Sequence, residues 1–273
     1  MAISINTNMA SIMAYKGLQS TSNALATSMQ RLATGLKINS AKDDAAGLAV
    51  ATRMTSQIRG ANQAIQNVNT GLSLVDVAIG ALDETLNSIQ SIRDLAVQAA
   101  DITATNDLTA LNNTVTELKT TIDNIATSTK FNNITLLDGT FSAETFQVGP
   151  GSTDTLSVTV TGTSQTSANL GLSAGDVLSA ANATTMIGLA DTAITSVNQL
   201  LASLSGYSSR FETIASTLST SVTGMTASRS AIMDADVAVE SSNLTKNSII
   251  QQAGVAVLSQ ANLQPKLFLK LFE

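Results

Sequence analysis

Apolar residues recur at alternating spacings of three and four along residues 51–96, the repeat expected for one face of a long α-helix. The positions, of which only Arg93 is polar, are Ala51, Met54, Ile58, Ala61, Ile65, Val68, Leu72, Val75, Ile79, Leu82, Leu86, Ile89, Arg93 and Ala96. At 1.5 Å per residue, this pattern predicts a helix about 70 Å long. Ser40 is its expected N-cap, with Asp43 and Asp44 in the first turn, where carboxylates suit the helix dipole.

Two further segments carry the same repeat. The second comprises Leu108, Leu111, Val115, Leu118, Ile122 and Ile125. The third comprises Met186, Ala190, Ala193, Val197, Leu200, Leu204, Tyr207, Phe211, Ile214, Leu218, Ser221 and Met225. The break at residues 101–106 is short and predicts an antiparallel turn-back. The fold class predicted is therefore mainly α, a long antiparallel bundle of heptad-patterned helices.

Residues 131–165 have a different pattern. Turn signals stand at Asp138-Gly139 and around Pro150, and apolar residues alternate on both sides of the second turn. The alternating residues are Phe146, Val148, Leu156, Val158 and Val160. This pattern predicts a small β-hairpin region, which we expect at the far end of the helical rod. Residues 162–182 are rich in Gly, Ser, Thr and Asn, which predicts a loop.

The two ends of the chain carry apolar residues around much of the helix circumference. A helix that is apolar on more than one side needs more than one neighbour. Each terminal helix can cover one face of the other, so we expect them to pair as a coiled coil. The remaining apolar faces favour contacts with other chains over an ordinary intrachain core.

This pattern predicts an inner terminal-helix domain of residues 1–39 plus 235–273, used for assembly. Residues 40–234 form the expected outer rod, with three long helical segments and the hairpin at about 131–165. The candidate assembly contacts are Ile5, Met9, Leu18, Leu25, Met29, Leu32, Leu36, Leu244, Ile250, Val257 and Leu258. The candidate residues of the rod and of its connection to the ends are Asp43, Asp44, Ile58, Leu82, Arg93 and Leu95.

Composition narrows the possible chemistry. The chain has 14 basic and 20 acidic residues, for a net charge of −6, so a nucleic-acid partner is not expected. It has no Cys and no His, which excludes disulfides, thiolate nucleophiles and a Ser-His-Asp triad. For Lys42-Asp43-Asp44 we favour capping and subunit packing over catalysis. We predict no catalytic residue, no cofactor and no metal site, hence no enzyme.

No targeting segment is predicted. The first eight residues lack both a positive region and a continuous apolar run, and Ala253–Leu258 is far shorter than the roughly 20 residues of a membrane helix. The chain is therefore expected either to stay in the cytosol or to leave the cell without a cleaved signal peptide. No insertion into a membrane is expected.

Several blocks resemble the signatures of bacterial flagellin. They are Ile5–Asn8, Gln30–Ala49, Gln90–Gln98, Phe131–Gly139, Ser228–Asp236 and Gln251–Asn262. The resemblance covers roughly residues 1–139 and 180–265, in the order of the family.

This resemblance implies a structural subunit that polymerises into the extracellular flagellar filament and serves motility. The terminal helices would form an inner tube and the rod an outer tube, in a minimal form with little variable outer domain. Implied partners are other copies of the chain, sister flagellins, the flagellar export apparatus and chaperone, junction proteins and the filament cap. The alternative is a hook–filament junction protein or another secreted helical surface protein.

The resemblance also marks a patch for the animal innate flagellin receptor at Gln90, Ser91, Arg93, Asp94 and Leu95. Ser91 stands where strong activators carry Arg, which argues against recognition. For Arg93 two interpretations stay open, a contact with another protein or a solvated residue where the helical seam ends. The C-terminal residues Phe268, Lys270 and Phe272 are bulkier or more charged than the usual ending of the family.

Overall fold

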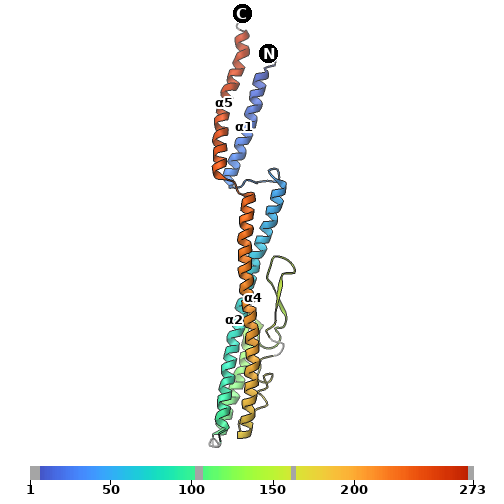
Figure 1. The fold of residues 1–273 in the computed structure, drawn as a ribbon, viewed down its shortest axis with the longest axis vertical. Coiled ribbons are helices and arrows are strands. Elements are labelled where there is room, and N and C mark those ends of the chain that lie inside the picture. Colours follow the sequence, from blue (N-terminus) through green and yellow to red (C-terminus); the bar gives the residue numbers. More distant parts are fainter. Residues whose placement is uncertain (1–6, 102–106, 161–163, 270–273) are drawn as a thin grey trace. The chain divides into compact units, whose positions relative to one another are not determined.

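The computed structural model describes residues 7–101, 107–160 and 164–269. Its contacts divide the chain into two compact units (Figure 1). The bundle unit is residues 57–223, and the terminal unit is residues 1–56 together with 224–273. The helices are α1 (Met9–Thr34), α2 (Ala45–Ala99), α3 (Leu108–Ser128), α4 (Ala180–Met233) and α5 (Val237–Leu269). The mainly α prediction is confirmed, and α2 and α4 each contribute to both units.

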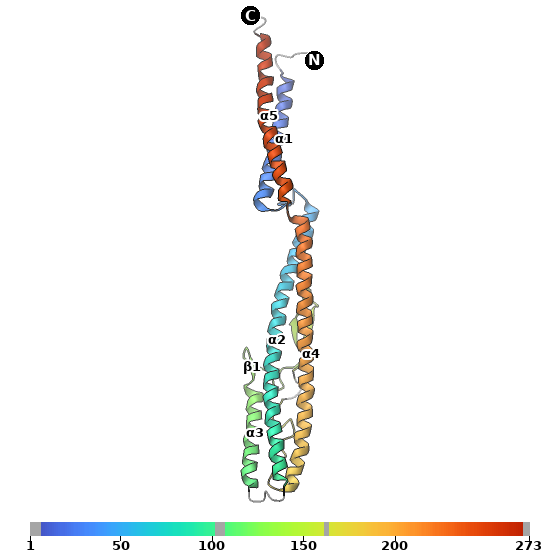
Figure 2. The same ribbon diagram turned by 60° about the vertical axis from the view of Figure 1, so that its left-hand side comes forward.

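In the bundle unit, α3 and α4 pack along α2 (Figures 1 and 2). Leu82 of α2, Ile122 of α3 and Leu204 of α4 are fully buried in one continuous apolar core. The same core includes Ile89, Met186 and other residues from the predicted stripes. The three predicted helical segments therefore form the expected bundle.

Five positions of the predicted stripe on α2 lie one residue away from the side chain that is buried. Positions Ala61, Val68, Val75, Leu82, Ile89 and Ala96 are buried as predicted. The alternate predicted positions Ile65, Leu72, Ile79, Leu86 and Arg93 are only half-buried. The buried residues beside them are Ala64, Gly71, Ala78, Thr85 and Ile92. Most of these are small, because a close approach of neighbouring elements leaves little room beyond the backbone.

The predicted hairpin is confirmed as β3 (Glu144–Gln147) and β4 (Thr155–Val158), which pair antiparallel. Its expected place at the far end of the rod is wrong. The Nδ2 atom of Asn67 in α2 donates a 3.1 Å hydrogen bond to the backbone oxygen of Gln147. The ring of Phe146 in β3 meets that of Phe211 in α4 edge-on, with centroids 5.5 Å apart. The hairpin therefore lies along the side of α2 and α4.

A second, shorter hairpin lies directly after α3, in β1 (Lys130–Phe131) and β2 (Ile134–Thr135). Its two turn residues, Asn132 and Asn133, have φ angles of 46° and 67°. Asparagine tolerates this left-handed conformation better than most residues, which suits a two-residue hairpin turn. This hairpin was not predicted from the sequence, although the Asn-Asn pair is a signal that could have identified it.

Residues 164–179 are irregular, as the loop prediction requires, but they are packed into the bundle unit. Leu172 and Val177 are fully buried. The carboxylate of Asp123 in α3 accepts hydrogen bonds from the backbone nitrogen and hydroxyl of Ser167, at 2.7 and 3.0 Å. Lys119 of α3 donates to the backbone oxygen of Gly175 at 2.5 Å. The segment is thus held against α3, and α4 already begins at Ala180, inside the predicted loop.

Candidate assembly interface

Helices α1 and α5 pack side by side in the terminal unit and run antiparallel (Figure 1). At one end, the Nδ2 atom of Asn8 donates to the backbone oxygen of Ala261 at 2.8 Å. At the other end, Arg31 Nη1 and Glu240 Oε1 are 3.0 Å apart. The prediction that the terminal helices pair with each other is confirmed.

The seam between these two helices is made mainly of small and polar residues. Its half-buried or buried positions on α1 are Ser11, Ala14, Leu18, Thr21, Leu25, Ser28 and Arg31. Those on α5 include Glu240, Leu244, Asn247, Gln251, Gly254, Leu258 and Ala261. Among the side chains described in α1 and α5, the buried ones are Ser28, Glu240 and Ala261, and none is a large apolar group.

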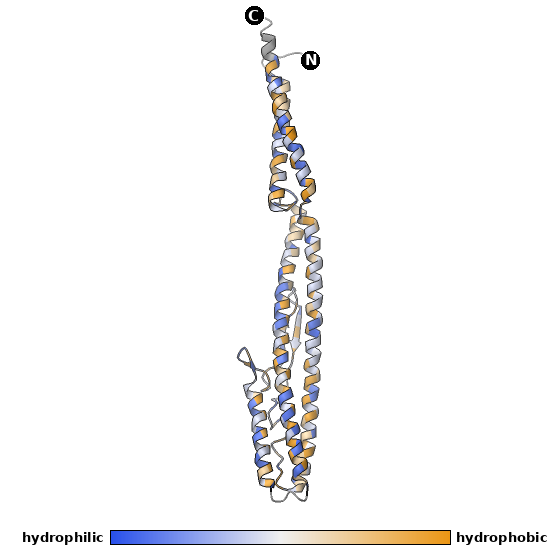
Figure 3. Cartoon of the chain, turned by 90° about the vertical axis from the view of Figure 1, so that its left-hand side faces the viewer, coloured by the Kyte–Doolittle hydropathy of each residue, from blue (hydrophilic) through white to orange (hydrophobic). Residues whose placement is uncertain are grey.

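Apart from four seam leucines, the large apolar side chains of α1 and α5 point instead to solvent. On α1 these are Met9, Ile12, Met13, Tyr15, Met29 and Leu32. On α5 they are Val237, Val239, Ile249, Ile250, Val255, Val257 and Leu263. Figure 3 shows hydrophobic and hydrophilic residues interleaved around both helices. The described part of the bundle unit exposes only Val77, Val97, Ile134 and Leu178 among its large apolar residues.

The pair is therefore inverted relative to an ordinary soluble helical hairpin, which buries its large apolar groups. An apolar surface of this kind marks an interaction site. The thirteen exposed large apolar side chains of α1 and α5 named above are hereafter called the outward face.

The predicted assembly residues fall into two groups. Met9, Met29, Leu32, Ile250 and Val257 belong to the outward face. Leu18, Leu25, Leu244 and Leu258 lie half-buried in the seam within the chain. Leu36 is half-buried just after α1, in a backbone bridge with Asp234, and Ile5 lies outside the described residues.

Sequence reasoning missed several members of the outward face as site residues. Tyr15, Val237 and Val239 were not singled out, although each is more than half exposed. Ile12, Met13, Ile249, Val255 and Leu263 also belong to the outward face but were not among the predicted contacts. Once the seam is placed, a helical wheel identifies all of them, but apolar residues alone do not place a seam made of polar ones.

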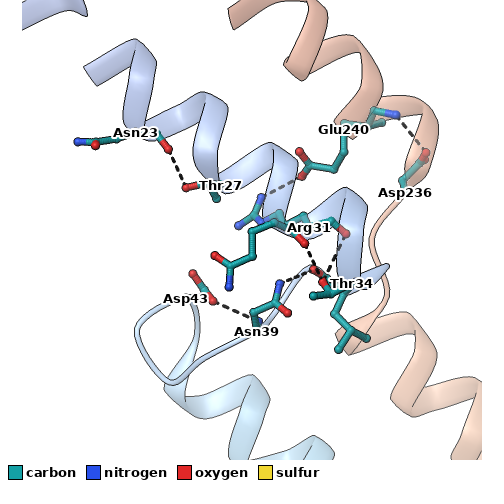
Figure 4. A network of polar contacts seen from close by, with 11 residues as sticks. Asn23, Thr27, Arg31, Thr34, Asn39, Asp43, Asp236 and Glu240 are labelled. Atoms are coloured by element: carbon teal, nitrogen blue, oxygen red, sulfur yellow. Dashed lines mark hydrogen bonds and ion pairs between the residues drawn. The ribbon is translucent and has the colours of Figure 1, made fainter. Parts of the chain in front are cut away.

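A partly buried ion pair closes one end of the terminal helices (Figure 4). The Glu240 side chain is only 9% exposed, and that of Arg31 is 30% exposed. Burial alone would raise the pKa of Glu240. The hydrogen bonds from Arg31, Ser28 and Asn243 together have a larger, opposite effect, so the pKa lies below its usual value. The carboxylate is thus held in its charged form between α1 and α5.

The segment between α1 and α2 is fixed by its two aspartates. Asp44 Oδ1 accepts a 2.9 Å hydrogen bond from the Gly47 nitrogen and caps α2. Asp43 Oδ2 accepts from the backbone nitrogens of Asn39 and Ser40, at 3.1 and 2.9 Å (Figure 4). Hydrogen bonds from Ser40 and Asn39 lower the pKa of Asp43. The prediction that Ser40 caps α2 is wrong, because Ser40 and Asp43 close a separate turn before the helix begins.

The other predicted residues lie in the bundle unit. Ile58 and Leu82 are buried, and Leu95 is half-buried. Arg93 is half-buried and pairs with Asp191 of α4, with Nε and Oδ1 2.7 Å apart. Arg93 therefore lies beside the buried stripe of α2 and has a partner within the chain. The remaining residues of the predicted receptor patch, Gln90, Ser91 and Asp94, are exposed.

The described residues include no group of three or more His, Cys, Asp or Glu side chains placed to hold a metal ion. In the same part of the chain, no helix has the length and apolarity to cross a membrane.

Two family profiles match the chain and together span most of it. The bacterial flagellin N-terminal helical region matches residues 5–142, and the bacterial flagellin C-terminal helical region matches residues 187–272. A flagellin of Halalkalibacterium halodurans is 35% identical over 268 residues, 98% of each chain. A flagellin of Bacillus subtilis is 36% identical over 98% of this chain and 99% of its own. The flagellar filament 33 kDa core protein of Treponema phagedenis is 37% identical over the same shares. The chain belongs to the bacterial flagellin family.

Proposed function

We propose that copies of this chain polymerise into the flagellar filament by burying the outward face of α1 and α5 against neighbouring copies. Membership of the flagellin family makes the chain a structural subunit of the extracellular filament. The observation that carries the proposal is the inverted packing of the terminal helices, most of whose large apolar side chains stay about half exposed within the described chain.

The outward face is large enough to drive association. Full burial of one Leu, Ile, Val or Met side chain contributes about 1.5–3 kcal/mol. Association itself costs about 4–15 kcal/mol. Since these side chains are already about half covered, several must be buried together to offset that cost, and α1 and α5 supply thirteen between them.

Few charges oppose this burial. Lys16 and Arg31 are the charged residues of α1, and Glu240 and Lys246 are those of residues 237–264. Arg31 and Glu240 are already paired with each other. Removing the outward face from water therefore strips hydration from few ions, which keeps the cost of assembly low.

An open filament requires a contact that joins different surfaces of successive copies. Such a heterologous contact does not close on itself and generates an open helical polymer. In this proposal residues 1–39 and 235–273 form the inner assembly domain and residues 40–234 the outer rod. The export apparatus, a chaperone, junction proteins, the filament cap and sister flagellins are proposed partners on the resemblance alone, as is export without a cleaved signal peptide.

Seeded polymerisation of purified subunits tests the proposal. Chains lacking residues 1–35 or residues 245–273 should not elongate filament seeds, while circular dichroism still shows a folded helical bundle. A finer variant replaces Met13, Ile249 and Val257 with Ser, and a matched control replaces Val77, Val97 and Leu178 of the bundle unit. Elongation by either truncated chain at the rate of the full-length chain would refute the proposal.

A further inference from the structure

The methionines are the side chains of this protein most open to two-electron oxidation. The chain has eight Met and no Cys, His or Trp. Thioether sulfur is therefore the softest nucleophile that it presents to a peroxide.

These sulfur atoms are distributed unevenly between the two units. Met186 is the single methionine within residues 57–223, and it is fully buried. The other methionines belong to the terminal unit. The bundle unit thus offers peroxide no accessible thioether.

Three of the terminal methionines lie on the outward face of α1. Met9 is 58% exposed, Met13 is 68% exposed and Met29 is 56% exposed. Met54, Met225 and Met233 are half-buried. Among the described methionines, the most exposed ones therefore lie on the helix face that assembly is proposed to cover.

We propose that Met9, Met13 and Met29 form a peroxide-sensitive modification site, and that their oxidation prevents a subunit from joining the filament. The inference rests on the proposed function. It names hydrogen peroxide, or another two-electron oxidant of that class, as the reactant.

The chemistry needs no further reactant. The sulfur attacks one peroxide oxygen, a sulfur–oxygen bond forms, the oxygen–oxygen bond breaks and water leaves. Sulfur loses the two electrons that the peroxide gains. The product is methionine sulfoxide, which is polar and accepts hydrogen bonds. Burying that oxygen in an apolar contact without a donor is costly.

The site acts before assembly and not after it. In a free subunit the three methionines are more than half exposed, whereas neighbouring copies would cover them in the proposed filament. Because Met186 is buried in either state, an oxidised subunit keeps its folded bundle. Peroxide therefore stops filament growth without dissolving filaments that already exist.

Oxidation of the full-length chain tests the site directly. Free subunits and assembled filaments are treated with the same dose of hydrogen peroxide, and the sulfoxides are located by peptide mass spectrometry. In free subunits Met9, Met13 and Met29 should oxidise at least about tenfold faster than Met186. Seeded elongation should fall at least about tenfold and return after treatment with both methionine sulfoxide reductases, which reduce the two epimers. In filaments the three residues should stay reduced.

Substitution separates these residues from other targets. The measured quantity is each variant's elongation rate after peroxide divided by its own rate before. This ratio should approach one for the Met9→Leu/Met13→Leu/Met29→Leu chain and stay low for the Met54→Leu/Met225→Leu control.

Three results would overturn the inference: equal peroxide sensitivity of the two variants, full elongation by subunits with sulfoxide at all three positions, or failure of the reductases to restore growth. If the triple variant does not fold, the location of the sulfoxides in the unaltered chain and the recovery of its elongation after reductase treatment still test the inference. An untreated chain that cannot elongate seeds would overturn the proposed function itself.

Discussion

Gly71 of α2 lies against the ring of Phe211 of α4: a methyl group built on Gly71 would stand 2.8 Å from Cζ and 3.1 Å from Cε1 of that ring. Phe211 is fully buried, and its ring also meets Phe146 of β3. Glycine in a helix interior normally costs about 1 kcal/mol relative to alanine. Here it makes room for the contact that joins α2, α4 and the hairpin.

Substitution of two glycines in α2 should therefore have opposite effects. Gly71→Ala should lower the free energy of unfolding by about 1–3 kcal/mol, because the added methyl group overpacks the core. Gly80→Ala should raise it by about 0.5–1 kcal/mol, because nothing lies within 4 Å of the added methyl group. Urea unfolding followed by circular dichroism measures both. Shifts of the same sign would contradict the close packing at Gly71.

Leu82 should be essential to the bundle. It is fully buried, so Leu82→Ala should cost about 2–5 kcal/mol of unfolding free energy. Leu82→Asp should unfold the bundle, because it buries an unpaired charge. Val77→Ala is the control, since Val77 is 41% exposed on the same helix and should cost less than about 1 kcal/mol. An unchanged thermal midpoint for the Asp variant would mean that the register is incorrect.

The pairing of α1 with α5 should weaken in acid. The pKa of Glu240 in the folded chain lies below its ordinary value of 4.5, so the charged carboxylate stabilises the fold at pH values above 4.5. This contribution is lost as the pH falls through the lowered pKa. Thermal unfolding between neutral pH and the acid side of that value should show a steeper loss for the natural chain than for Glu240→Gln. Parallel pH profiles would rule out this role of Glu240.

The Arg93–Asp191 ion pair should contribute little to stability. Its side chains are 40% and 54% exposed, and water screens such pairs. A double-mutant cycle with Arg93→Ala and Asp191→Ala should give a coupling energy below about 1 kcal/mol, smaller still at high salt. A coupling well above that value would show that the pair is desolvated in solution.

The repeat of three and four could predict the helices, and it placed every seventh residue of α2 in the core. It failed at the alternate positions because hydropathy favours large side chains such as Ile65 and Leu72, whereas close packing selects the smaller Ala64 and Gly71. No local signal predicts where the hairpin packs, because that depends on a contact as distant in sequence as Asn67 with Gln147.

For the terminal helices too, hydropathy predicted part of the structure and not the rest. The spread of apolar residues correctly predicted uncovered faces on the terminal helices. It did not predict which residues turn inward, since Ser28 and Glu240 lie in the seam while Met13 and Val257 lie outside it. A seam held by an ion pair and small residues has no hydropathy signature.

A helix pair without a core of its own has a consequence for when filaments begin. Two copies that meet in solution must each hold α1 and α5 in place with a single neighbour to cover them, so the first encounters are unfavourable. An existing tip offers several neighbours at once. In the proposed assembly, spontaneous polymerisation is therefore expected to start after a lag, through a rare critical nucleus, and the number of filaments to follow the number of starting points supplied rather than the amount of protein made.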